Sequence, residues 1–205
     1  MPFNCDERGV VNRPIRATHV TLTAAAVNLT LSLGKLAAGA ISGSAALVAD
    51  GVHSLSDLVT DAVVLAGVRC SRRPADESHN YGHGKVETLA SVAVGGILAV
   101  VALGIMVDGV QGILTAARGE PLAAPSLAAL VVALVSIAAK EALFRYTRAA
   151  GRQLDSPALL ANAWHQRSDA LSSAAVAAGV AGATLGGESW RVLDPLAAAV
   201  VALLI

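Results

Sequence analysis

The chain has 205 residues and 15 acidic and 15 basic side chains, so its formal net charge is zero. Hydrophobic residues make up 55% of the sequence and charged residues only 15%, compared with about 25% in soluble domains. This composition excludes an ordinary soluble domain, and the zero net charge gives no reason to expect nucleic-acid binding. Two cysteines, Cys5 and Cys70, are too few for a disulfide framework. The class that fits is an all-α, polytopic integral membrane protein.

Six apolar segments are expected to cross the membrane after a polar N-terminal tail, residues 1–16, for which no removable signal peptide is expected. The expected spans cover about residues 17–39, 45–70, 86–108, 122–146, 157–185 and 192–205. The clearest is the uncharged run from Thr88 to Val107, long enough to cross about 30 Å of hydrocarbon. Residues 108–121 are expected to form a polar loop, and Pro157 suits the first turn of the fifth helix. The last span is too short to cross completely, so we expect a truncated sixth helix and no C-terminal cytoplasmic domain.

The distribution of basic residues predicts the orientation in the membrane. Ten of the 15 Lys and Arg residues lie in the N-terminal tail and in the second-to-third and fourth-to-fifth linkers: Arg8, Arg13, Arg16, Arg69, Arg72, Arg73, Lys85, Arg145, Arg148 and Arg152. Only Arg118 and Arg191 lie in loops on the other side. Because basic loops stay in the cytoplasm, the N-terminus and these linkers are expected there.

Two segments contain His-x-x-x-Asp within otherwise apolar sequence: His53 with Asp57, and His165 with Asp169. Residues four apart on a helix lie on the same face, so each segment offers an imidazole beside a carboxylate. An ionised Asp in the middle of a bilayer costs roughly 2.5–3.5 kcal/mol even on the mildest scale. Two such helices facing each other would supply two nitrogens and two oxygens, a tetrahedral set that suits zinc.

The alternative for each pair is a buried His–Asp hydrogen bond that joins helices. Identical spacing on two separate spans favours a divalent cation, because the ion and its ligands neutralise each other. Asp50 and Asp61 extend the stripe of the second span by about a turn at either end. They either line an ion path or form hydrogen bonds with neighbouring spans.

The linker after the second span contains a third set of ligand-type side chains, Asp76, His79 and His83. It fits a second metal site at the cytoplasmic mouth and a solvated loop equally well. Gly82 and Gly84 disfavour a regular helix there, and a zinc-protease His-Glu-x-x-His motif is missing because Asn80 follows His79.

These motifs together resemble the cation diffusion facilitator family of metal transporters. The resemblance is carried by residues 42–57 (SGSAALVADGVHSLSD), 73–87 (RPADESHNYGHGKVE) and 161–170 (ANAWHQRSDA). It implies six transmembrane helices, a homodimer in the inner or plasma membrane, and export of a divalent metal from the cytoplasm in exchange for protons. The resemblance implies that His53, Asp57, His165 and Asp169 form the transport site of the family. It likewise implies that Asp76, His79 and His83 form the linker site of the family.

Members of the family with two His-x-x-x-Asp pairs resemble zinc transporters, whereas manganese-type members carry Asp in place of the histidines. Zn²⁺ is therefore the expected substrate, with Fe²⁺, Co²⁺, Ni²⁺ and Cd²⁺ as alternatives and protons as the counter-ion. Rocking of the second and fifth spans would expose the site alternately to either side. A non-transporting metal-binding membrane subunit and an intramembrane metal-dependent hydrolase are the other classes that the motifs allow.

Overall fold

The structure is a computed structural model that describes residues 7–71 and 84–205. Over these residues it is all-helical, as the sequence predicted, with no strand. The helices are α1 (Glu7–Ser42), α2 (Ala45–Ser71), α3 (Gly84–Ala117), α4 (Leu127–Gln153), α5 (Pro157–Leu185) and α6 (Leu193–Ala202), with a short 3-10 helix, η1 (Glu188–Trp190), before α6. Helix α5 covers the same residues as the expected fifth span, and Ser156 caps it by accepting a hydrogen bond from the Leu159 amide.

The expected polar loop over residues 108–121 is wrong for residues 108–117, because α3 continues without interruption to Ala117. Asp108 is an exposed residue within this helix, and Gly109 lies where α3 packs closely against Ala199 of α6. The helix ends where Gly119 adopts a positive φ of 76°. Helix α4 then begins at Leu127 rather than at residue 122, because Pro121 and Pro125 interrupt the intervening segment.

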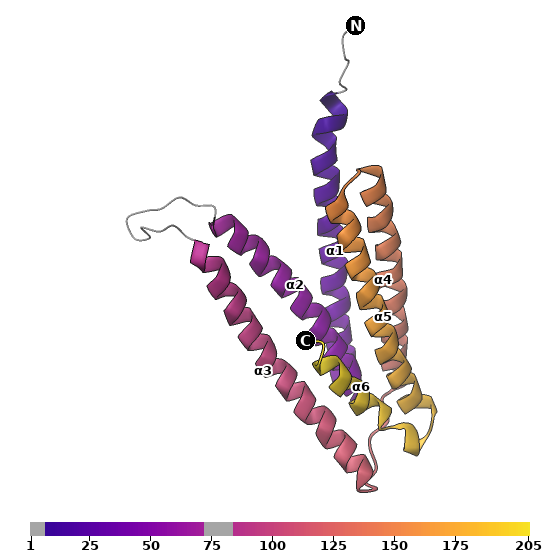
Figure 1. Cartoon of the computed structure of the whole chain (residues 1–205). Coiled ribbons are helices and arrows are strands. Elements are labelled where there is room, and N and C mark those ends of the chain that lie inside the picture. Colours follow the sequence, from indigo (N-terminus) through magenta and orange to yellow (C-terminus); the bar gives the residue numbers. More distant parts are fainter. Residues whose placement is uncertain (1–6, 72–83) are drawn as a thin grey trace.

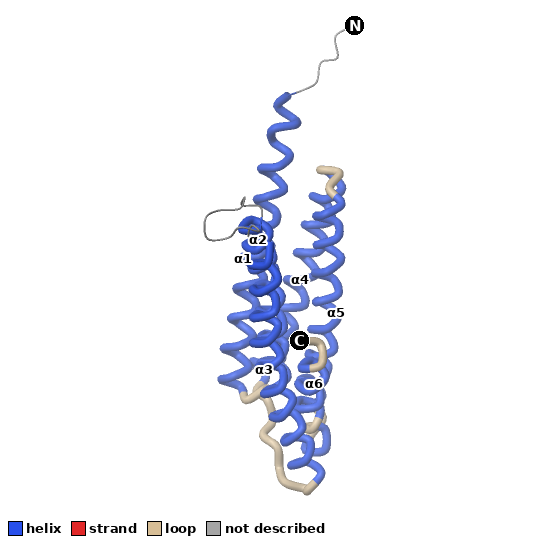
Figure 2. Tube along the Cα trace, turned by 60° about the vertical axis from the view of Figure 1, so that its left-hand side comes forward, coloured by secondary structure: helices blue, strands red, loops and turns tan. Residues whose placement is uncertain are grey.

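The helices form two groups that diverge toward one end of the molecule. Helices α1, α4 and α5 run side by side, whereas α2 and α3 lean away from them toward the end that carries the N-terminus (Figure 1). At the opposite end, α6 packs against α2, α3 and α5. The turned view shows the described connections between helices toward the two ends of the molecule (Figure 2). This is the arrangement that a membrane-spanning bundle requires, since its irregular backbone lies outside the hydrocarbon.

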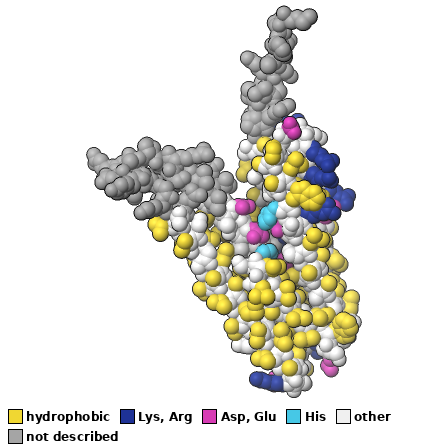
Figure 3. Space-filling model, viewed as in Figure 1, with side chains coloured by type: hydrophobic (Ala, Val, Ile, Leu, Met, Phe, Trp, Pro, Cys, Tyr) yellow, Lys and Arg dark blue, Asp and Glu magenta, His cyan; other side chains and the backbone are white. Residues whose placement is uncertain are grey.

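The core between the helices consists mainly of small side chains, and many of the large apolar ones face outward. Ala46, Ala49, Ala129 and Ala133 are buried together with Val176 and Val180. Leu89, Val92, Ile97, Val100 and Leu103 of α3 are all exposed, and hydrophobic atoms cover much of the face seen in Figure 3. Three helical segments, Arg16–Ser42, Thr88–Ala117 and Leu127–Gln153, are long and apolar enough to cross a membrane. Small residues inside and large apolar residues outside are typical of helices packed in lipid.

A carboxylate from α6 caps the N-terminus of α2. Asp194 accepts hydrogen bonds from the Ser44 hydroxyl at 2.5 Å, the Ala45 amide at 2.7 Å and the Ala46 amide at 3.4 Å. The Ser44 hydroxyl in turn accepts from the Leu47 amide at 3.2 Å. A negative charge at this position also complements the helix dipole. The cap therefore joins the end of α2 to α6 and sets the direction in which α2 leaves the bundle.

Replacing Asp194 with Ala is expected to destabilise the protein by about 2–3 kcal/mol, because three donors lose their buried acceptor. Thermal unfolding in detergent, followed by circular dichroism, measures the effect. Glu188→Ala removes the same charge from an exposed position nearby and serves as the control. Equal unfolding temperatures for the two variants would contradict the role assigned to the cap.

Candidate metal site

The first half of the site is the His53–Asp57 pair of α2. The two side chains lie one turn apart, with His53 Nε2 4.0 Å from Asp57 Oδ2. Their side chains are 15% and 29% exposed, so the pair is neither fully enclosed nor turned out to the surroundings. In the space-filling view, histidine and acidic side chains gather on the surface between the two groups of helices (Figure 3).

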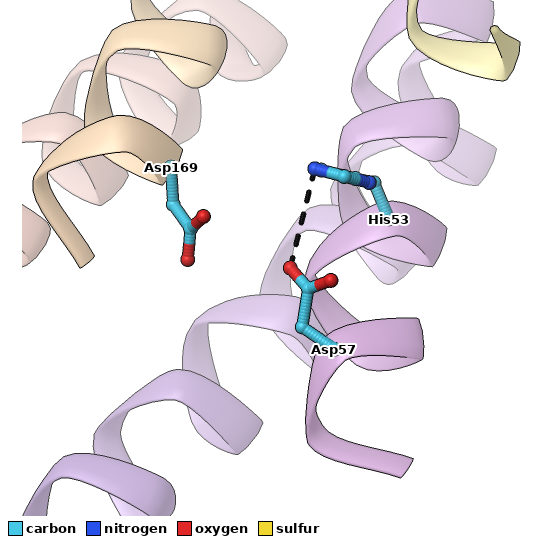
Figure 4. Close-up of side chains that lie close together, drawn as sticks. All are labelled: His53, Asp57 and Asp169. Atoms are coloured by element: carbon cyan, nitrogen blue, oxygen red, sulfur yellow. Dashed lines mark ion pairs between the residues drawn. The ribbon is translucent and has the colours of Figure 1, made fainter. Parts of the chain in front are cut away.

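Helix α5 supplies the third ligand-type side chain. Asp169 points from α5 toward the His53–Asp57 pair (Figure 4), and one ligand atom from each of the three residues lies within 4.8 Å of the others. Residues more than a hundred positions apart in the sequence thus meet between α2 and α5. The two His-x-x-x-Asp motifs predicted that four side chains would meet between these helices, and three of the four do so here.

The chemistry of these atoms fits a divalent cation. The Nδ1 atom of His53 and the Oδ2 atom of Asp57 are buried and have no hydrogen-bond partner, and buried polar atoms without partners are rare. With bonds of 2.0–2.1 Å, ligand atoms on a tetrahedral zinc ion lie about 3.3 Å apart. The three ligand atoms lie within 4.8 Å of one another, so small changes of side-chain rotamer or helix position would bring them to the spacing of a bound ion.

The fourth predicted ligand, His165, lies at the edge of the site. Its Nδ1 atom is 4.0 Å from Asp169 Oδ1, but the side chain is 53% exposed and is not one of the three clustered ligands. His165 lies one turn from Asp169 on the same face of α5. Its role as a ligand stays a prediction.

The two acids that flank the stripe on α2 have different surroundings. Asp50 is buried and pairs with Lys35 of α1, with Asp50 Oδ2 2.7 Å from Lys35 Nζ, and its Oδ1 accepts a hydrogen bond from Ser173 of α5 at 3.0 Å. Asp61 is exposed. Asp50 therefore belongs to the helix contacts, which is one of the two roles that the sequence left open.

Sequence reasoning did not include Lys140 of α4, which lies beside the site, among the candidate site residues. Its side chain is 2% exposed, and its ammonium lies 3.9 Å from Asp169 Oδ2 and donates to the Ser54 hydroxyl at 3.1 Å. The only signal in the sequence is a lysine following a long apolar run, and that does not reveal which carboxylate it faces.

A group of aromatic and basic side chains fixes α5 against α4 next to the site. The Phe144 and Trp164 rings lie 5.6 Å apart, and the guanidinium of Arg167 lies 4.9 Å from the Phe144 ring centre and 5.6 Å from that of Trp164. Arg167 thus lies against these two rings, which stabilise its charge through cation–π interactions.

The predicted linker site, Asp76, His79 and His83, lies outside the described residues.

The fold and site define an integral membrane protein with candidate metal ligands between two of its helices. The family model of the cation efflux transmembrane domain matches residues 21–205. The chain therefore belongs to the cation diffusion facilitators, a family of metal-cation transporters.

Three relatives show the range of the similarity. The magnetosome protein MamB of Magnetospira sp. (strain QH-2) is 41% identical over 179 residues, which cover 87% of this chain and 59% of that protein. The manganese efflux system protein MneP of Bacillus subtilis is 38% identical over 190 residues, 91% of this chain and 62% of its own. Metal tolerance protein 2 of Oryza sativa is 38% identical over 199 residues, which cover 86% of this chain and 50% of that protein. The chain thus spans between 50% and 62% of the length of these relatives.

Replacing Asp57 with Asn is expected to lower the affinity for Zn²⁺ by at least about tenfold, because one ligand charge is removed from the site. Calorimetric titration of the protein in detergent measures the affinity. Asp61→Asn, one turn further along α2 and exposed, is the matched control and should bind as the unmodified chain does. Equal affinities for the two variants would remove Asp57 from the ligand set.

Proposed function

We propose that the protein exports a divalent metal cation from the cytoplasm, with His53, Asp57, His165 and Asp169 as its transport site. The observation that carries the proposal is the approach of His53, Asp57 and Asp169 ligand atoms to within 4.8 Å between α2 and α5. Membership of the cation efflux family supports the same reaction, as do the names of the relatives MneP and metal tolerance protein 2.

Zn²⁺ is the proposed substrate, because imidazole nitrogens together with carboxylate oxygens suit zinc better than the harder Mn²⁺. His53 lies within the cluster, and His165 requires only a rotation to join it. The relative MneP is named for manganese efflux, so manganese joins Fe²⁺, Co²⁺, Ni²⁺ and Cd²⁺ among the alternatives that a competition experiment must include.

The site is proposed to face the cytoplasm in this conformation. The N-terminal end of the chain and the α4–α5 connection lie at the end toward which α2 and α3 diverge (Figure 1). Arg145, Arg148 and Arg152 lie in the part of α4 that leads to this end, whereas Arg118 and Arg191 belong to the opposite connections. The excess of basic residues supports a cytoplasmic location for the divergent end. Rocking of α2 and α3 against α1, α4 and α5 would then close the site on this side and open it on the other.

Protons are the proposed counter-ion. A metal ion requires a neutral imidazole and an ionised carboxylate, so its binding releases protons and its departure lets them return. His53 and His165 supply the imidazoles that must be neutral to bind metal, and they are the proposed proton carriers. The same ligands can therefore exchange one metal ion for protons during each cycle.

Two further proposals come from the sequence resemblance. The linker residues Asp76, His79 and His83 are proposed to hold a second metal at the cytoplasmic mouth, and the protein is proposed to act as a homodimer in an inner or plasma membrane. Calorimetry of a triple alanine variant of the linker, and the mass of the protein in detergent, test these two points separately.

Replacing Asp169 with Ala is expected to abolish zinc transport, because the one carboxylate that α5 contributes to the cluster is lost. The measurement is Zn²⁺ uptake into proteoliposomes with an imposed proton gradient. Asp108→Ala, an exposed acid of α3, is the control that should transport normally. Transport by the Asp169 variant would refute the proposed site, and zinc binding without flux in the unmodified chain would favour a non-transporting metal-binding subunit.

Replacing His53 with Asp is expected to relax selectivity toward Mn²⁺ or Cd²⁺, since the nitrogen ligand that favours Zn²⁺ is lost. Competition of these ions with Zn²⁺ uptake in the same proteoliposomes measures the shift. His19→Asp, an exposed histidine of α1, provides the control for a new carboxylate elsewhere. An unchanged order of preference would argue against His53 as a ligand.

A further inference from the structure

Two lysine ammonium groups lie inside the helix bundle, and their partners differ. Lys35 of α1 lies 2.7 Å from Asp50 Oδ2 and also donates to the hydroxyl groups of Ser173 at 3.1 Å and Ser54 at 3.4 Å. Lys140 of α4 donates to the same Ser54 hydroxyl at 3.1 Å. Lys35 therefore has a close carboxylate partner, Asp50. The only group that Lys35 and Lys140 both contact is the neutral hydroxyl of Ser54.

The carboxylate that balances Lys140 is a candidate metal ligand. Its ammonium lies 3.9 Å from Asp169 Oδ2, with the lysine side chain 2% exposed and that of Asp169 11% exposed. Asp50 cannot replace Asp169, because one of its oxygens contacts Lys35 and the other accepts from Ser173. Lys140 and a bound metal ion would therefore share the same carboxylate.

The charges of these groups show the consequence. With neutral imidazoles, Lys35 and Asp50 cancel, which leaves the two negative charges of Asp57 and Asp169 and the positive charge of Lys140. A divalent cation alone would neutralise the two carboxylates. With Lys140 present, the bound divalent cation leaves the site with one excess positive charge. This charge lies inside the protein, where water screens charges weakly.

We propose that Lys140 is a tethered counter-cation of the transport site. Its ammonium partly neutralises Asp169 while the site is empty, and it repels the divalent ion once that ion is bound. It thereby weakens the affinity for the metal and hastens its release. This inference rests on the proposed transport site and adds a residue that sets its affinity.

The test compares three variants of α4 by calorimetric titration with Zn²⁺ in detergent at fixed pH and salt. Lys140→Met, which keeps the length of the side chain and removes its charge, is expected to bind Zn²⁺ at least about tenfold more tightly. Lys140→Arg, which keeps the charge, should stay within about threefold of the unmodified chain. Arg145→Met removes a positive charge from an exposed position of the same helix and should leave the affinity unchanged.

Transport supplies a second readout of the same variants. In proteoliposomes, Lys140→Met is expected to lower both the KM for Zn²⁺ and the maximal rate, because a more tightly held ion leaves more slowly. A merely structural role for Lys140 predicts the reverse for affinity, since a disturbed site binds more weakly. Unchanged or weaker zinc binding by a Lys140→Met variant of normal helix content would overturn the inference.

The Asp169→Asn variant separates this inference from the proposed site. If it binds Zn²⁺ as well as the unmodified chain does, the site itself is wrong. If it loses binding while Lys140→Met shows no gain, the site stands and the role of Lys140 fails.

Should Lys140→Met not fold, Lys140→Gln tests the same contact, because it also removes the charge and keeps a donor for the Ser54 hydroxyl. It is expected to bind Zn²⁺ more tightly than the unmodified chain in the same calorimetric titration. Unchanged or weaker binding by this variant would overturn the inference.

Discussion

Charges buried between membrane-spanning helices must be balanced by other charges or by an ion, and this requirement organises the centre of the protein. Asp50 is neutralised by Lys35 at 2.7 Å, which joins α1 to α2, and Ser173 connects the same carboxylate to α5. Asp57 and Asp169 have no partner as close as this within the described helices, and Lys140 stands 3.9 Å from one of them. The paired charges hold the helices together, and the less completely paired ones leave a place for a cation.

The same balance relates metal binding to the shape of the bundle. Asp57 lies on α2, which leans away together with α3, and Asp169 lies on α5 in the other group of helices (Figure 1). The proposed cation between their ligand atoms, which lie within 4.8 Å of one another, would therefore hold the two groups of helices together. The cap that Asp194 places on α2 lies at the opposite end, where α2 and α6 stay in contact. A movement of α2 about this capped end would change the ligand spacing with little disturbance of the packed end.

Comparison of the two His-x-x-x-Asp pairs shows where sequence reasoning works and where it stops. Spacing along a helix is local geometry, so the pairing of His53 with Asp57, and of His165 with Asp169, followed directly from the sequence. Apolar composition likewise predicted the all-helical class. The end of α3 was misjudged, because the polar residues after Val107 suggested a loop, whereas glycines packing against α6 allow the helix to continue.

The sequence by itself determined that this is a helical membrane protein with two imidazole–carboxylate couples on separate spans, because periodicity and hydropathy depend on near neighbours. Only the tertiary structure decided which of those side chains meet, that His165 lies turned outward, and that Lys35 and Lys140 face different carboxylates. The reason is physical: which charge balances which depends on how four helices, distant in sequence, are rotated and packed against one another.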